Sequence, residues 1–187
     1  MAVIDPTVTW ARVEERLATE SDPILRRNLE VLLAHMKAEA AGDLDGLLAT
    51  LSDDVAYHVY AAPDVAELNP VGKPGVRKFY ADFIASGATK LQFAIDRLVV
   101  DRACILTEGT MRMAYPGRTL AARGIDVDDH DASYLFETRM AVLWPFDDDG
   151  LALGEDTYSA GDGFVGISAR KLRPEDVIEL TGSPAGA

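Results

Sequence analysis

The stretch from Ser133 to Ala160 constrains the fold more than any other part of the chain. Apolar and aromatic side chains recur at alternate positions in its first half, which is the period of a β-strand. The run Asp147-Asp148-Asp149-Gly150 then supplies carboxylates for a turn and a glycine free to adopt positive φ, and residues 151–160 return as a second strand. The sequence therefore predicts a long β-hairpin. One face of its first strand carries Tyr134, Phe136, Met140, Val142, Trp144 and Phe146, and the other carries Leu135, Glu137, Arg139, Ala141 and Leu143.

Polar residues lie in the middle of both hairpin strands, where charge in an otherwise apolar sheet needs an explanation. If residues 147–150 form the loop, Ala141 lies opposite Asp156 and Arg139 lies opposite Tyr158. Arg139 is then the diagonal neighbour of Asp156. The polar residues expected on this shared face are Glu137, Arg139, Asp156 and Tyr158.

Two interpretations of this pair remain open, and both depend on the register. The Arg139–Asp156 pair is either a structural ion pair on a convex surface or a tuned acid/base group, with Tyr158 orienting a substrate oxygen. A bulge that shifts the register by one residue would bring Glu155 beside Arg139 instead.

Chain length and net charge limit the classes of protein to which this chain can belong. A chain of 187 residues with 48% hydrophobic side chains can bury a core, so we expect one domain. Eighteen basic against 31 acidic residues give a formal charge of −13, which repels nucleic acid and anionic membrane surfaces alike. We therefore expect no nucleic-acid partner and no membrane partner.

Targeting signals and cysteine usage indicate the cytoplasm. The N-terminus lacks a continuous apolar segment, and no run of about 18 apolar residues occurs elsewhere, so we expect no export signal and no transmembrane helix. Cys104 is the only cysteine, which excludes an internal disulfide and a cysteine-based metal site. The acidic residues 126–131 lack the glycine and the distal glutamate of a calcium loop, so we expect no metal there.

Start and stop signals divide the rest of the chain into helices followed by strands. Ser21-Asp22-Pro23 begins a helix that Gly42 ends, and residues 1–20 look like an added helical arm. Residues 116–132 form a long polar connection, typical of a lid or rim, and residues 172–187 form a tail. The other expected elements are helices at Thr7–Ala18, Leu44–Leu51 and Pro74–Ala85, and strands at Val55–Tyr60, Lys90–Val100 and Ala103–Tyr115.

This order of elements predicts an α+β fold. We expect a cone-shaped, curved antiparallel sheet wrapped around about three helices, with a pocket on its concave side. The runs AGDLDGLLATLSDDVAYHV, GKPGVRKFYADFIA and AVLWPFDDDGLALGEDTYS resemble the SnoaL-like branch of the nuclear transport factor 2-like superfamily. The resemblance covers about residues 26–161, within a single SnoaL-like domain that spans 1–187.

The resemblance implies a ligand pocket in the mouth of the cone and, commonly, a homodimer through the convex face. Members include polyketide cyclases, epoxide hydrolases, dehydratases, ketosteroid isomerases and proteins that only bind ligands. Asp156 resembles the acidic residue that hydrolases and cyclases of this type carry on a late strand. The hydrolases also need an Arg-x-Asp pair, and here Glu108-Gly109-Thr110 stands in its place.

His58 is the best single general acid/base candidate, because imidazole titrates near neutral pH. Dehydratase members use paired histidines, and no second histidine fits, because His35 is on a helix and His130 is in the acidic loop. A histidine that is simply hydrogen-bonded in a rim or core is the competing interpretation. Aromatic and apolar residues could line a cavity or merely fill a core.

We expect an enzyme without a bound cofactor that performs proton transfer, as in cyclisation, dehydration or isomerisation, on a hydrophobic oxygenated small molecule. The alternative is a non-catalytic module that binds a ligand or a partner through the same fold. The expected catalytic residues are Asp156, His58 and Arg139, and the expected substrate-binding residues are Tyr57, Tyr60, Phe79, Tyr80, Glu108, Met111 and Tyr158.

Overall fold

The computed structural model describes residues 2–180, and over that range the chain is α+β, as predicted. None of its helices is long and apolar enough to cross a membrane. The α-helices are α1 (Val8–Thr19), α2 (Pro23–Ala41), α3 (Leu44–Ala49), α4 (Gly72–Ala85) and α5 (Gly117–Ala122). The strands are β1 (Leu51–Val59), β2 (Leu91–Val100), β3 (Cys104–Pro116), β4 (Ser133–Pro145), β5 (Ala152–Ser159) and β6 (Lys171–Leu172), and short 3₁₀ turns are η1 (Ala66–Leu68), η2 (Ile167–Ala169) and η3 (Pro174–Asp176).

One curved sheet carries all six strands in the order β1-β5-β4-β3-β2, with β6 paired to the far end of β4. The pairs β2–β3, β3–β4 and β4–β5 are antiparallel, as expected for consecutive strands. The sheet is mixed, however, because β1 runs parallel to β5. Alternation of side chains predicts a strand but not its direction, so the sequence did not reveal this parallel pair.

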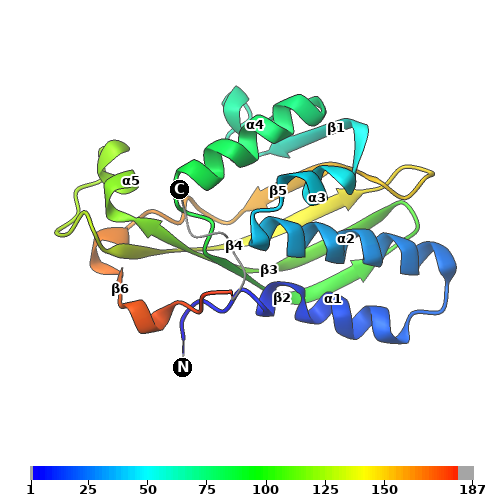
Figure 1. Cartoon of the computed structure of the whole chain (residues 1–187), viewed down its shortest axis with the longest axis horizontal. Coiled ribbons are helices and arrows are strands. Elements are labelled where there is room, and N and C mark those ends of the chain that lie inside the picture. The colour runs from blue at the N-terminus through cyan, green and yellow to red at the C-terminus, as the bar shows by residue number, and fades with distance from the viewer. Residues whose placement is uncertain (1, 181–187) are drawn as a thin grey trace.

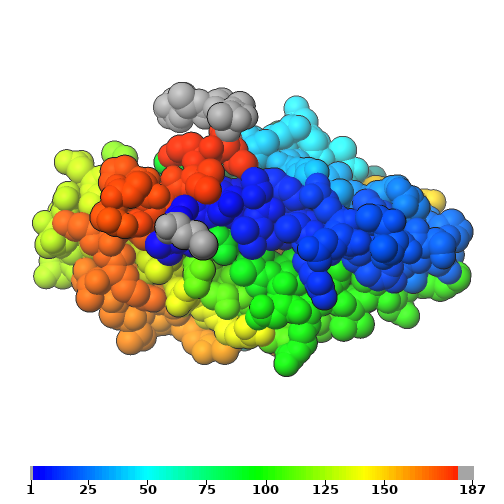
Figure 2. Space-filling model, turned by 90° about the horizontal axis from the view of Figure 1, so that it is seen from below, coloured from blue at the N-terminus to red at the C-terminus, as the bar shows by residue number. Residues whose placement is uncertain are grey.

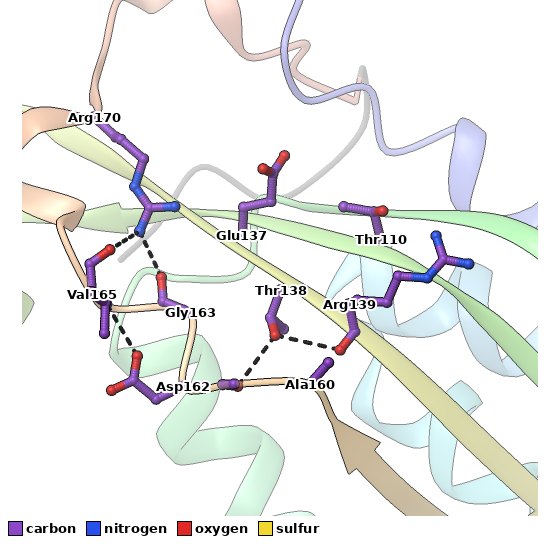
Figure 3. A pocket seen from close by; sticks show the side chains of 10 residues that line it. Thr110, Glu137, Thr138, Arg139, Ala160, Asp162, Gly163, Val165 and Arg170 are labelled. Atoms are coloured by element: carbon purple, nitrogen blue, oxygen red, sulfur yellow. Dashed lines mark hydrogen bonds between the residues drawn. The ribbon is translucent and has the colours of Figure 1, made fainter.

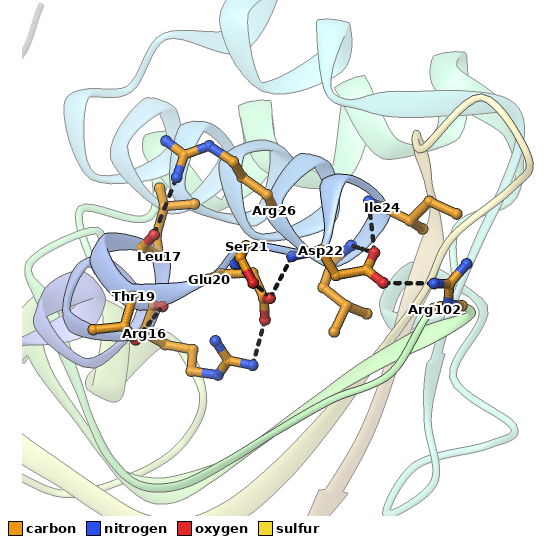
Figure 4. Close-up of polar contacts among 10 residues, drawn as sticks. Arg16, Leu17, Thr19, Glu20, Ser21, Asp22, Ile24, Arg26 and Arg102 are labelled. Atoms are coloured by element: carbon orange, nitrogen blue, oxygen red, sulfur yellow. Dashed lines mark hydrogen bonds and ion pairs between the residues drawn. The ribbon is translucent and has the colours of Figure 1, made fainter.

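The helices α2, α3 and α4 lie across one side of the sheet, which is its concave, buried side (Figure 1). The helix α2 begins where predicted, because the Asp22 side chain accepts hydrogen bonds from the backbone of Ile24 and Leu25 and also pairs with Arg102 (Figure 4). Gly42 ends this helix with φ of 68°. The main core forms between these helices and the inner faces of β1–β5, and includes Leu29, Leu32, Met36, Leu47, Val55, Val76, Phe93, Val142 and Trp144.

The N-terminal helix α1 belongs to the core and is not an added arm. Val13 is fully buried in the main cluster, and Thr9 accepts a hydrogen bond from the backbone of Phe93 on β2. The residues before α1 lie beside the C-terminal segment (Figure 2), where Ile4 bridges to Val177. The predicted tail is therefore docked as far as residue 180, and residues 181–187 lie outside the described range.

The hairpin predicted at residues 133–160 is present as β4 and β5, but its register differs by two residues. Ala141 lies opposite Tyr158, and Leu143 lies opposite Asp156. Leu151 joins the loop, and a bulge adds one more residue on β5 between the Phe146 bridge and the paired region. Because the shift is even, each residue keeps its predicted face.

The connection at residues 116–132 was expected to be irregular, and it contains the short helix α5. Leu120 of α5 is fully buried in a second apolar cluster with Tyr115 and Tyr134. This segment is therefore packed against the end of the sheet farthest from the 147–150 turn.

Candidate active site

The parallel pairing of β1 with β5 sorts four candidate residues onto opposite faces of the sheet. Tyr57 pairs with Glu155, and the next pair along is His58 with Asp156. Successive side chains on a strand point to opposite faces. Tyr57 is 3% exposed and lies in the main core, whereas the His58 side chain is 52% exposed on the outer face. Tyr57 and Glu155 therefore share the concave face, and His58 and Asp156 share the convex face.

On the concave face, Glu155 is the centre of a buried polar cluster. The Tyr80 hydroxyl of α4 donates a hydrogen bond to Glu155 Oε1 at 3.0 Å. His35 Nε2, from the middle of α2, lies 3.3 Å from the same oxygen and 3.3 Å from the Tyr80 hydroxyl. The His35 side chain is 1% exposed and that of Glu155 is 18% exposed, so a carboxyl and an imidazole meet largely out of water.

The hydrogen bonds around His35 fix the position of one proton. The Thr50 hydroxyl donates to the Leu47 carbonyl at 2.6 Å, so its oxygen accepts from His35 Nδ1, which is 2.8 Å away. We therefore assign a proton to Nδ1. The other ring nitrogen, Nε2, lies within ion-pair distance of Glu155, and the Tyr80 hydroxyl lies within 3.3 Å of both groups.

Glu39 adds a second carboxyl group to this region. It follows His35 by one helical turn on α2, so both side chains lie on the same side of the helix. The residue as a whole is half-buried, but its carboxyl group is withdrawn from water. That burial, reinforced by the negative charge of Glu155 and opposed by His35, raises the pKa of Glu39 to about 7.

Two phenols complete the concave cluster. Burial, and then the charge of Glu155, raises the pKa of Tyr57 and of Tyr80 well above the ordinary phenol value, so both remain protonated donors. The Tyr57 hydroxyl is buried and has no hydrogen-bond partner among the described residues. Phe79 packs edge-on against both tyrosine rings, at centroid distances of 6.0 Å from Tyr57 and 5.2 Å from Tyr80.

On the convex face, Arg139 is engaged by carboxylates of other strands. It donates to Glu108 on β3, with its Nη2 2.6 Å from Oε1, and it also pairs with Asp96 on β2. Hydrogen bonds from Arg139 and then Arg97 hold the pKa of Glu108 below its usual value. Arg139 does not contact Asp156. Arg139 also borders an open hollow of about 420 Å³ at the end of β5 (Figure 3). In the wall of this hollow, Arg170 donates hydrogen bonds to the backbone carbonyls of Gly163 and Val165.

Asp156 instead bonds His58 on the convex face, with 2.6 Å between Oδ1 and Nδ1. Beside this pair, the exposed rings of Tyr60 and Tyr158 stack with centroids 4.4 Å apart. Met111 is partly buried against the main core. The concave side thus holds Tyr57, Phe79, Tyr80 and Met111 of the predicted set, and the convex side holds Asp156, His58, Arg139, Glu108, Tyr60 and Tyr158.

Sequence reasoning did not select His35 and Glu39, although a signal for them was present. Each lies three residues after a member of the apolar stripe of α2, namely Leu32 and Met36, so each borders the buried side of that helix. An ionisable residue next to a core stripe is a candidate for a pocket. His35 had been set aside because it lies on a helix.

Solved structures similar to this chain share its fold at low sequence identity. A protein described as a SnoaL-like polyketide cyclase, from Shewanella putrefaciens CN-32, superposes with a TM-score of 0.64 at 11% identity, over 90% of this chain and 97% of that one. A Δ5-3-ketosteroid isomerase from Mycobacterium sp. gives a TM-score of 0.53 at 16% identity, over 71% and 92%. A protein with a ketosteroid isomerase-like fold from Catenulispora acidiphila DSM 44928, in complex with trimethylamine, gives a TM-score of 0.56 at 13% identity, over 75% and 93%.

Sequence comparison assigns the family directly. No protein with a curated description matches this chain. The SnoaL-like domain family matches residues 32–131, which is more than half of the chain and includes His35, Glu39, Tyr57 and Tyr80. The helices, the curved sheet and this match together identify the chain as a member of the SnoaL-like domain family.

Proposed function

We propose that this protein binds a small, hydrophobic, oxygenated molecule on the concave side of its sheet and catalyses proton transfer on it without a bound cofactor. Cyclisation, dehydration and isomerisation are the reaction types of this class. The observation that carries the proposal is the largely buried contact between His35 Nε2 and Glu155 Oε1 at 3.3 Å, which places an imidazole beside a carboxyl group.

In this proposal, Glu155 removes or returns a proton of the substrate and His35 exchanges that proton with it. The Thr50 hydroxyl holds the imidazole so that Nε2 faces the carboxylate. Tyr57 donates a hydrogen bond to a substrate oxygen, where negative charge develops when a neighbouring carbon loses its proton, while Tyr80 keeps its hydrogen bond to Glu155.

A second candidate is ligand binding without turnover. Two of the similar structures are complexes, one with trimethylamine and one, TerC, with polyporic acid at a TM-score of 0.57. They favour small-molecule binding for this fold but say nothing of chemistry in this chain. The two candidates differ only in whether a bound molecule is changed.

Exchange of carbon-bound protons in D₂O tests the proposal without knowledge of the substrate. Cyclohexanone, β-tetralone and a Δ5-3-ketosteroid are incubated with the protein, and the ¹H NMR signals of the CH groups beside each carbonyl are followed. We expect signal loss faster than in buffer for at least one ketone. If none exchanges faster while line broadening shows that a ketone binds, the second candidate is the correct one.

We also propose that the convex face pairs with a second copy of the chain, because that face exposes apolar surface. Tyr60, Tyr158 and Val99 are 49%, 44% and 59% exposed there. Sedimentation is expected to show a dimer, and Tyr158→Asp is expected to shift it to a monomer by burying an unpaired charge. A monomeric wild-type protein at the highest attainable concentration contradicts this proposal.

A further inference from the structure

An open hollow on the convex side of the sheet is large enough for a small molecule, with a volume of about 420 Å³. The outer faces of β3 and β4, the loop that follows β5 and Arg170 border it (Figure 3). The sheet separates this hollow from the concave cluster around Glu155. Its charged and exposed apolar side chains are Glu137, Arg139, Asp162, Val165 and Arg170.

Arg170 brings to the hollow a positive charge that pairs with no carboxylate among the described residues. Its Nη2 donates hydrogen bonds to the backbone carbonyls of Gly163 and Val165, at 2.7 Å and 3.1 Å, and these bonds fix the orientation of the guanidinium. Its Nε is buried and has no hydrogen-bond partner within residues 2–180. Figure 3 shows the remaining nitrogen directed away from the two carbonyls and over the hollow. A guanidinium held in this way presents unused N–H donors at a fixed place.

The charges on the other side of the hollow are already balanced within the protein. Arg139 is bound by Glu108 and Asp96. Glu137 accepts a hydrogen bond from Arg112 Nε at 2.6 Å. The chain has 31 acidic residues against 18 basic ones, so carboxylates are in excess and an arginine without one is notable. The guanidinium of Arg170 is therefore the group of the hollow that an anion from outside the chain can complete.

The rest of the lining suits the apolar body of a ligand. Asp162 turns its carboxylate to its own loop, where Oδ1 accepts hydrogen bonds from the backbone N–H groups of residues 164 and 165 at 2.7 Å and 3.1 Å. Gly161 and Gly163 bring no polar side chain, and Val165 is 83% exposed. A ligand that covers Val165 removes apolar surface from water, which is favourable.

We propose that this hollow binds a small monocarboxylate, with the carboxylate paired to Arg170 and the apolar body of the ligand packed on Val165. A guanidinium binds a charged carboxylate more strongly than it binds a neutral oxygen. A doubly charged phosphate fits less well, because the carboxylates of Glu137 and Asp162 border the hollow and repel a second negative charge. The inference goes beyond the proposed function, since the site lies on the opposite side of the sheet from Glu155.

Benzoate and benzamide, which have similar shapes and differ in charge, test the proposal directly. Each is titrated into the ¹⁵N-labelled full chain at neutral pH and constant ionic strength, and the backbone amide signals are followed by ¹H–¹⁵N NMR. We expect saturable shifts from benzoate in residues 160–165 and beside Arg170. Benzamide should bind about tenfold more weakly or worse, because it forms no charge-assisted hydrogen bond with the guanidinium.

Three variants separate the charge of Arg170 from its contacts with the loop. Arg170→Gln should weaken benzoate binding about tenfold or more. Arg170→Lys loses the forked geometry of the guanidinium but keeps the charge, so it should bind benzoate more tightly than Arg170→Gln does. Arg118→Gln is the matched control, because Arg118 is an exposed arginine of α5 that does not line the hollow, and this variant should leave Kd unchanged.

Equal affinity for benzoate and benzamide, or no saturable benzoate shift, overturns the inference, and this comparison needs no variant. Shifts confined to α2, α4 and β1 overturn it as well, because they place benzoate on the concave side. An equal loss in Arg170→Gln and Arg118→Gln would show that net charge, and not the hollow, attracts benzoate. Ketone exchange is measured separately, so failure of this inference leaves the proposed function standing.

Discussion

Replacement of Glu155 by glutamine is expected to slow the exchange of ketone α-protons by a factor of about 100 to 10,000, which is the usual contribution of a positioned general base. Glutamine has the shape of glutamate and can still accept the hydrogen bond from Tyr80. It has no carboxylate that could take a proton from the substrate. Exchange followed by ¹H NMR in D₂O, together with an unchanged circular dichroism spectrum, measures the loss of chemistry in a folded protein.

Asp156→Asn is the matched control, because Asp156 is the next residue on β5 and lies on the opposite face. It removes the carboxylate that bonds His58. If chemistry takes place on the concave side, this variant keeps the wild-type exchange rate. If Asp156→Asn abolishes exchange and Glu155→Gln does not, the reaction belongs to the convex His58–Asp156 pair and the concave assignment is wrong.

The sequence predicted which residues share a face of the hairpin, but not which polar residues meet. A two-residue period groups Arg139 with Asp156 and Tyr158, and that grouping is confirmed on the convex face. The separation of these residues along the strands depends on the loop length and on the bulge in β5. Neither can be predicted from the alternation of apolar and polar side chains. Arg139 therefore bonds Glu108 and Asp96, residues of β3 and β2, in place of Asp156.

The buried cluster was harder to predict, because its members come from four separate elements. They are His35 and Glu39 on α2, Tyr57 on β1, Tyr80 on α4 and Glu155 on β5, and only the parallel pairing of β1 with β5 and the packing of α2 and α4 across them bring the groups together. Helical and strand periods describe one element at a time. The alternative register placed Glu155 beside Arg139, whereas in the structure Glu155 contacts His35 and Tyr80.

Gly154→Ala is expected to destabilise the protein by about 3 kcal/mol, because a methyl group there must push two strands apart. A Cβ on Gly154 would lie 1.9 Å from the carbonyl oxygen of Ala56, which is a backbone atom of β1 and cannot turn away. The affected pairing sets Tyr57 opposite Glu155. A loss of this size lowers Tm by roughly 6–12 °C for a chain of this length.

Gly75→Ala in α4 is the control for this substitution. The nearest atom to its Cβ would be Pro70 Cβ at 3.5 Å, an ordinary contact, and alanine favours a helix over glycine by about 0.5–1 kcal/mol. Thermal and denaturant unfolding should therefore show Gly75→Ala at or above wild-type stability. Since Gly154→Ala also separates Tyr57 from Glu155, it should lose ketone exchange at temperatures where it remains folded. Normal exchange in a destabilised Gly154→Ala protein would show that the β1–β5 contact supports the fold but not the site.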